Sequence, residues 1–227
     1  MNPYRLDIDG VYIVVTHKRV RNFRLVVNPD GQVRASVPRH VSVDETVDFL
    51  RDRIDWVRRT QAKMAARAPV PRPLADGGTV RVWGDEVPLH VVAGRPRTTL
   101  STDGLTIRVA DPHDQAAIAA AVATLYRRET RAVLGDLISK WTAVLPRGPS
   151  RVVLRTMRTR WGSCTPVSGA IRINPELAAR HPRCLNYVVL HELVHLTQPG
   201  HGPAFCAVMD AHLPGWRAIR AELNGRR

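Results

Sequence analysis

The chain has 227 residues, enough to bury a substantial core without disulfide bonds. Its net charge of +14 comes from 34 basic and 20 acidic residues, and because Lys18, Lys63 and Lys140 are the only lysines, the excess is arginine. A field of this sign attracts polyanions such as nucleic acid or acidic polypeptide. The arginines are scattered and accompany no nucleic-acid-binding motif, so we favour a solvating role for them.

The cysteines and the termini indicate the compartment. Cys164, Cys184 and Cys206 form no CxxC pair and cannot all pair within the chain, which is typical of a reducing environment. The N-terminus lacks the basic and apolar segments of a signal peptide, and the longest uncharged apolar stretch, around residues 116–126, is too short to cross a bilayer. We therefore expect a cytoplasmic protein that does not associate with a membrane.

The first forty residues predict strands. VYIVV (11–15) is followed by NFRLVV (22–27) and QVRASV (32–37), which are joined through the turn sequence Asn-Pro-Asp-Gly at 28–31. The last two runs therefore predict a β-hairpin.

A helix follows the strands. Ser42 and Glu45 form a capping-box pattern, and apolar residues then recur at helical spacing, which predicts one helix to about Arg67. The Pro- and Gly-rich stretch at 68–78 predicts a connector.

The rest of the chain alternates between strand and helix patterns. Four short strands are predicted at 79–84, 87–92, 98–101 and 105–109, and a long helix opens at Asp111-Pro112 and stops near Pro146. RVVLRT (151–156) and GAIRIN (169–174) are predicted to form a hairpin across the RWGSCTPVS loop. Further helices are predicted at 182–198, 203–211 and 215–223. We expect an α+β fold with three parts: strands plus helix at 1–67, connector and short strands at 68–110, and a catalytic region at 111–227.

Residues 188–205, VVLHELVHLTQPGHGPAF, place His191 and His195 four residues apart around Glu192. Each residue of an α-helix advances by about 100°, so residues four apart lie about 40° from coincidence on one face. The two imidazoles can bind one metal ion, and Glu192, about 100° round from His191, can reach a water on that metal. This HExxH pattern predicts two ligands and a general base on one helix.

Zinc requires a further protein ligand, and His201 lies six residues after His195. Pro199 and Gly200 break the helix between them, and we expect Gly200 to adopt a positive φ that carries His201 back towards the helix end. Pro203 then suits the first turn of a new helix. The turn chemistry thus favours a zinc site with three histidines.

The alternative is an ordinary amphipathic helix that carries structural histidines. Apolar residues surround the motif and leave few other polar positions: Leu185, Val188, Val189, Leu193, Val194 and Leu196. Burying two histidines and a glutamate in such a helix is costly without a partner, and a metal supplies one. The remaining histidines occur singly, and we leave them out of the site: His17, His40, His90, His113, His181 and His212.

Four segments together resemble a known family. RTRWGSC (158–164), GAIRIN (169–174), YVVLHELVHL (187–196) and HGPAF (201–205) are similar to the YgjP-like metallopeptidases, relatives of the SprT-like zincins. The N-terminal half contains patterns that are loosely similar to the same family, so the likeness covers most of the chain as one family unit.

The resemblance implies a zincin-like catalytic region with an HExxH active-site helix. It implies that His191, His195 and His201 bind Zn²⁺ and that Glu192 is the catalytic base. It further implies that GAIRIN flanks this helix where an extended peptide substrate lies.

The subfamily is less sharply indicated. Cys206 stands where we expect Trp in close YgjP relatives. The resulting sequence HGPAFC (201–206) resembles the SprT-like branch more closely. The spacing of His195 and His201 also matches metzincins, but those have Gly where this chain has Gln198.

Other residues near the motifs have two interpretations each. Arg160 can contact a substrate carbonyl or carboxylate or steady an anionic intermediate, or it can form a structural ion pair. Tyr187, one turn before the first histidine, can donate a hydrogen bond in the site or belong to the core. For Cys164 and Cys206 we favour buried small residues, and for Trp161 packing against the helix.

The sequence therefore predicts a zinc-dependent metallopeptidase that acts on polypeptide through a metal-activated water and a glutamate base. One alternative is a metal-dependent nucleotide phosphohydrolase, which the arginine surplus favours. Another is a protein that binds nucleic acid through its arginine-rich surface and keeps zinc for structure. The oligomeric state is open.

Overall fold

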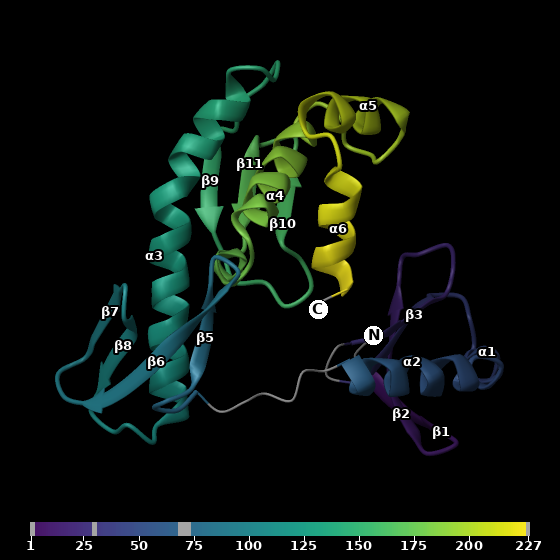
Figure 1. Cartoon of the computed structure of the whole chain (residues 1–227). Helices are drawn as coiled ribbons and strands as arrows, with labels where there is room; N and C mark the ends of the chain where they lie inside the picture. The colour runs from purple at the N-terminus through teal and green to yellow at the C-terminus, as the bar shows by residue number, and fades with distance from the viewer. Residues whose placement is uncertain (1–2, 29–30, 68–73, 226–227) are drawn as a thin grey trace. The chain divides into compact units, whose positions relative to one another are not determined.

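The structure is a computed structural model that describes residues 3–28, 31–67 and 74–225. It is a mixed α+β fold, as predicted, and it divides into two compact units, residues 1–71 and 72–226 (Figure 1). The connector expected at 68–78 lies partly outside the described residues, and the division into three parts stays a prediction. No helix in the described ranges is long and apolar enough to cross a membrane.

The first unit is a four-stranded sheet in the order β1-β2-β4-β3. Its strands are β1 (Tyr4–Ile8), β2 (Val11–Lys18), β3 (Arg24–Val27) and β4 (Val33–Pro38). The predicted hairpin is confirmed because β3 and β4 are antiparallel, although Pro29 and Asp30 of its turn lie outside the described residues. β1 was not predicted, although its apolar residues alternate with the exposed Arg5 and Asp7 as in a half-buried strand.

Two helices, not one, pack on this sheet: α1 (Val43–Arg51) and α2 (Ile54–Arg67). The capping box of Ser42 and Glu45 is confirmed. The single helix expected to Arg67 is wrong, because α1 ends at Arg51, with Asp52 as its C-cap, and α2 begins at Ile54. Leu50, Ile54 and Val57 keep helical spacing across the break and are all buried, so the apolar pattern does not reveal it.

The second unit begins with a four-stranded sheet and a long helix. The sheet, in the order β5-β6-β8-β7, consists of β5 (Thr79–Val82), β6 (Asp85–Ala93), β7 (Arg97–Ser101) and β8 (Gly104–Val109). Its four strands confirm the predicted ones. α3 (Gln115–Thr142) buries Ile118, Val122 and Leu125 in one core with this sheet. The N-cap of α3 is Asp114, three residues after the expected start.

A second, three-stranded sheet lies beside the C-terminal helices, in the order β10-β11-β9. Its strands are β9 (Arg151–Leu154), β10 (Gly162–Thr165) and β11 (Ala170–Ile173). The predicted hairpin of β9 with β11 is wrong, because these two strands are parallel and β11 is instead antiparallel to β10. The short β10 lies inside the stretch that was expected to be a loop; its residues Gly-Ser-Cys-Thr give little strand signal.

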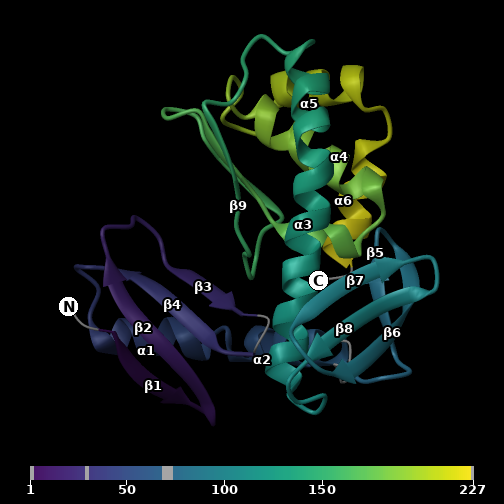
Figure 2. The same ribbon diagram turned by 90° about the vertical axis from the view of Figure 1, so that its left-hand side faces the viewer.

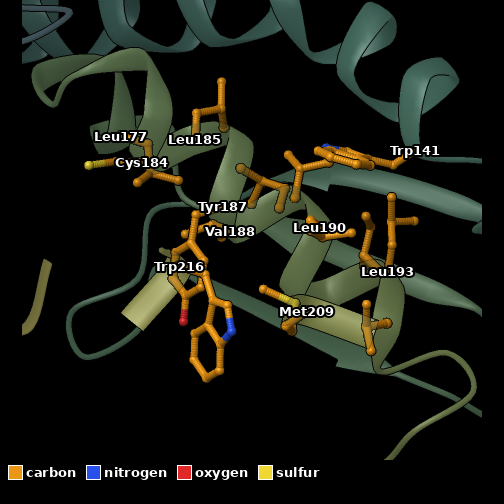
Figure 3. Close-up of a cluster of buried hydrophobic side chains, with 14 of the residues drawn as sticks. Trp141, Leu177, Cys184, Leu185, Tyr187, Val188, Leu190, Leu193, Met209 and Trp216 are labelled. Carbon is orange, nitrogen blue, oxygen red and sulfur yellow. The ribbon is translucent and has the colours of Figure 1, made fainter. Parts of the chain in front are cut away.

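The C-terminal part is helical and contains the main core. A 3₁₀ helix, η1 (Pro175–Ala179), precedes α4 (Pro182–Val194), α5 (Pro203–His212) and α6 (Trp216–Gly225), so the three predicted helices are confirmed. α4 is surrounded by buried side chains from α3, η1, α5 and α6, as Figure 3 shows (for example Trp141, Leu177, Met209 and Trp216). This all-round burial explains why α4 has so few polar positions.

Asn174, at the end of β11, fixes the loop between β9 and β10. The side chain is 1% exposed, and its amide donates hydrogen bonds to the carbonyl oxygens of Met157 and Arg160 at 2.9 and 3.1 Å. Its amide oxygen accepts a hydrogen bond from the N–H of Glu176 at 3.2 Å. One buried side chain therefore holds both the loop and the start of η1.

We predict that Asn174→Ala destabilises the second unit by about 1–3 kcal/mol, because it leaves buried backbone groups without partners. Denaturant unfolding followed by tryptophan fluorescence measures this change. Asn224→Ala, at an exposed position of α6, is the matched control and should change stability by less than about 0.5 kcal/mol. Equal stability of the two variants would contradict the role of Asn174.

Candidate metal centre

α4 carries the first two histidines at its C-terminal end. His191 lies in the last turn, and His195 is the C-cap residue, whose N–H bonds to the carbonyl oxygen of His191. The helix was expected to continue to residue 198 but ends at Val194. The chain leaves the helix within one turn of His195, which allows the following residues to fold back.

The turn after α4 brings in the third histidine. Pro199 and Gly200 lie in this turn, but Gly200 does not have a positive φ, so the expected left-handed reversal there is wrong. Gly202 is the N-cap of α5, and Pro203 occupies its first turn as predicted. His201 therefore stands directly before a helix that packs on α4.

The three histidines converge on one point. The Nε2 atoms of His191 and His195 are 3.1 Å apart, and that of His201 lies 3.2 Å from each of them. Two nitrogens bound to a tetrahedral zinc at about 2.05 Å are separated by about 3.3 Å. The spacing of the three nitrogens thus fits a metal of this size, and among the described residues they are the only group of three or more such side chains that could hold a metal ion.

Surrounding groups fix the orientation of the rings. Phe205, which is 1% exposed, lies 4.8–5.0 Å from all three imidazole rings between centroids. Nδ1 of His195 lies 2.8 Å from the carbonyl oxygen of Gln198, which can only accept, so the proton is on Nδ1 and the Nε2 lone pair is free. Burial lowers the pKa of His191 to about 3, with a further contribution from its histidine neighbours, so this imidazole is neutral near pH 7. Neutral rings with free Nε2 atoms are the form that binds a metal.

Glu192 is buried beside the start of β10. Glu192 is only 5% exposed, and this burial raises the pKa of its carboxyl to about 8. The positive charge of Arg160 has the opposite, smaller effect on this pKa. The close neighbour is Gly162: a Cβ there would lie 2.5 Å from Oε1 of Glu192 and 2.7 Å from its Cγ. The glutamate can occupy this position because residue 162 has no side chain.

The other predicted site residues lie at different depths. Tyr187 is 5% exposed, and its hydroxyl lies 3.3 Å from Nδ1 of His191, so it touches a histidine of the group from within the core. Burial raises the pKa of this phenol to about 12. Arg160 is exposed on the loop before β10 and forms no ion pair among the described residues. Its charge nevertheless acts on the pKa of Glu192.

The residues expected to be structural have mixed positions. Trp161 is half-buried and packs against the main core, with the Arg180 guanidinium 5.5 Å from its ring centroid. Cys164 and Cys206 are half-buried, not fully buried, and pack against the same core. Burial raises the pKa of the Cys164 thiol, so it is protonated near neutral pH.

Sequence reasoning missed two residues of this site. Gly162 gave no signal because a glycine before a serine and a cysteine is an ordinary loop pattern. Arg220, on α6, is exposed. Burial and the neighbouring histidines are the larger causes of the lowered pKa values of His191 and His201, and the charge of Arg220 adds a smaller effect in the same direction. Its position depends on how α6 packs on α4, which no local motif reveals.

The edge of the small sheet next to α4 belongs to β10. β11, which contains GAIRIN, pairs with β10 on one side and with β9 on the other. GAIRIN flanks α4 as implied, because Ile171 and Ile173 share a core with this helix. Both edges of β11 are occupied, so an extended substrate cannot pair with this strand itself. β10 is the border strand of this sheet and contacts α4, which lies in front of it in Figure 1.

Two solved structures are similar to part of the chain. The metallopeptidase zymogen abylysin of Pyrococcus abyssi is 20% identical over 39% of this chain and 90% of its own, with a TM-score of 0.36. The zymogen jannalysin of Methanocaldococcus jannaschii is 16% identical over 41% of this chain and 90% of its own, with a TM-score of 0.33. Likeness at this level is too weak to support a conclusion. No curated protein matches the chain.

A family model gives a much wider match. The model of the YgjP-like metallopeptidase domain matches residues 21–226, which include β3, β4 and both helices of the first unit and the whole second unit. The resemblance carried by the four segments between 158 and 205 is confirmed. The chain belongs to the YgjP-like family of metallopeptidase domains.

Proposed function

We propose that the chain is a zinc-dependent peptidase of the zincin type, with His191, His195 and His201 as metal ligands and Glu192 as catalytic base. The observation that carries this proposal is the convergence of three Nε2 atoms within 3.2 Å of one another at the end of a buried HExxH helix. Membership of a metallopeptidase family supports it independently.

The donor set favours zinc over harder cations. Three imidazole nitrogens suit Zn²⁺, whereas Mg²⁺ and Ca²⁺ prefer carboxylate and carbonyl oxygens. A bound zinc ion would polarise the scissile carbonyl and lower the pKa of water to about 7. Nδ1 of His195 donates a hydrogen bond to the carbonyl oxygen of Gln198, and Nδ1 of His191 bonds to the hydroxyl of Tyr187. These two bonds would hold the rings with Nε2 towards the ion.

In this mechanism Glu192 moves the protons. In its ionised form, whose share rises as the pH approaches its pKa of about 8, its carboxylate would take a proton from the attacking water and deliver it to the leaving amine. Gly162 leaves room for the carboxylate at the edge of the site. Arg160 and Arg220 bring positive charge to the same region and can stabilise negative charge that develops on the substrate oxygen.

The free edge of β10 offers a place for the polypeptide substrate. An edge strand has a row of backbone groups without partners in its own sheet, and an extended peptide can pair with them. β10 starts at Gly162, which lies against Glu192, so a peptide on this edge would pass the catalytic base.

The first prediction concerns metal content. The purified protein should contain about one zinc ion per chain, because three ligands and an open position form one site. The triple variant His191→Ala, His195→Ala, His201→Ala should lose it, as measured by elemental analysis. His113→Ala, at an exposed position far in the sequence from the three histidines, is the control and should keep the metal. Unchanged zinc in the triple variant would refute the assigned ligands.

The second prediction separates metal binding from catalysis. Glu192→Gln should keep zinc and slow the cleavage of fluorescein-labelled casein by at least about 100-fold, because it removes the general base. Release of phosphate from ATP, measured in parallel, tests the nucleotide hydrolase alternative. Undiminished casein cleavage by Glu192→Gln would rule out the glutamate mechanism, and phosphate release that depends on Glu192 would favour the alternative.

The third prediction tests the close approach of β10 to the base. In Gly162→Ala the added Cβ would lie 2.5 Å from Oε1 of Glu192, so the carboxylate must move. We expect casein cleavage to fall by about 10- to 100-fold, since a displacement of about 1 Å has effects of this size, with zinc content unchanged. Gly135→Ala, where a Cβ meets no atom within 4 Å, should be fully active. Full activity of Gly162→Ala would show that the position of the carboxylate does not matter.

A further inference from the structure

A cavity of about 430 Å³ lies next to β10 and is lined by cations and hydroxyl groups. The loop between β9 and β10 and two residues of the sheet, Ser163 and Arg172, form its walls. The complete lining is Arg155, Thr156, Met157, Arg158, Thr159, Arg160, Ser163 and Arg172, and we call it the arginine cavity. These lining residues carry four guanidinium groups and three hydroxyls, and none of them carries a carboxylate.

Within the described ranges, none of the four guanidinium groups forms an ion pair with a carboxylate. The charge of Arg160 acts on the Glu192 carboxyl without such a contact. Arg172 donates a hydrogen bond to the hydroxyl of Thr165 at 3.2 Å, which leaves its charge uncompensated. Repulsion between four unpaired cations is relieved by an anion, and guanidinium groups bind carboxylates with charge-assisted, often bidentate hydrogen bonds.

The arginine cavity adjoins the proposed catalytic site. Ser163 follows Gly162, against which the Glu192 carboxyl lies. Arg160 lines the cavity, and its charge also lowers the pKa of Glu192 against the larger effect of burial. The loop is held in place by the hydrogen bonds of buried Asn174 to two of its carbonyl oxygens. A group in the cavity is therefore only about one residue away from the base along β10.

The pleat of the small sheet separates the two sites by face. Ser163 pairs with Arg172, so both project from one face, whereas Gly162 and Cys164 pair with the fully buried Ile173 and Ile171 and project towards α4. A peptide that pairs with β10 alternates its side chains in the same way. Every second side chain of such a peptide would thus point to the face of the arginine cavity.

We infer that the arginine cavity binds an acidic side chain of the polypeptide substrate and that the protein selects Asp or Glu next to the cleaved bond. This inference rests on the proposed function. It gives a local role to arginines whose even distribution along the sequence suggested only solvation. Nucleic acid would bind the same charges, and the test below therefore includes binding of an oligonucleotide as one of its outcomes.

The test measures binding and cleavage separately. Zinc-loaded Glu192→Gln is titrated with fluorescein-labelled peptides of alternating Ala and Glu, or of alternating Ala and Gln, and anisotropy is recorded. The Glu peptide should bind about 10-fold or more tightly, the effect of charge-assisted hydrogen bonds. Adding Arg158→Gln and Arg172→Gln should abolish this preference. The paired Lys substitutions, which keep the charge, should restore part of it, and Arg131→Gln, exposed on α3, should have no effect.

The same peptides and variants with Glu192 intact give the cleavage arm. Wild-type protein should cleave the Glu peptide with a higher kcat/KM than the Gln peptide, by about 10-fold or more, and the Arg158→Gln, Arg172→Gln variant should cleave both equally. Unfolding midpoints confirm that the variants are folded.

Equal binding of the two peptides, or a preference that survives the double variant, overturns the inference even if casein is cleaved. Selective peptide binding without any cleavage overturns the proposed function alone. Tighter binding of a labelled single-stranded oligonucleotide, lost in the same variant, assigns the cavity to nucleic acid and overturns the inference.

Discussion

The site depends on the convergence of three imidazole nitrogens at the end of a buried helix. Three like groups within 3.2 Å of one another do not attract each other, so the surrounding structure must hold them there. The restraint comes from packing: α4 is buried on all sides, and Phe205 of α5 contacts all three rings. The free energy of folding thus provides the preorganisation that a metal requires.

The neighbours of α4 have distinct tasks in this arrangement. α5 and α6 fix the turn that carries His201, because their residues Met209 and Trp216 belong to the same core as α4 (Figure 3). The small sheet packs on α4 through Ile171 and Ile173, which brings β10 to the glutamate of the helix. α3 connects this core with that of the four-stranded sheet within the second unit, as Figure 2 shows along its length. Two sheets and one long helix therefore support a site whose three histidines and glutamate all lie within residues 191–201.

Local sequence signals predicted the helical half of the site, and long-range pairing escaped them. The spacing of His191, Glu192 and His195 depends only on helical geometry, and Pro203 marked the next helix. The parallel pairing of β9 with β11 has no local signature, because the two strands are joined through β10. β10 was itself hidden by its small residues, so the free edge and Gly162 beside the glutamate were hidden with it. Even in the turn, the residue types were right but the expected φ of Gly200 was not.

The arginine surplus acquires a different meaning once the fold is known. A charge of +14 spread over the sequence describes a field, and a field alone does not select a ligand. Folding of the β9–β10 loop onto Asn174 brings three of these charges together with a fourth, Arg172 of β11, around one cavity beside the edge strand. In the inferred mode of binding, long-range attraction would bring acidic chains to the protein generally, whereas the cavity would discriminate by geometry at one position. The same residue type thus contributes to the encounter through its number and to selectivity through its placement.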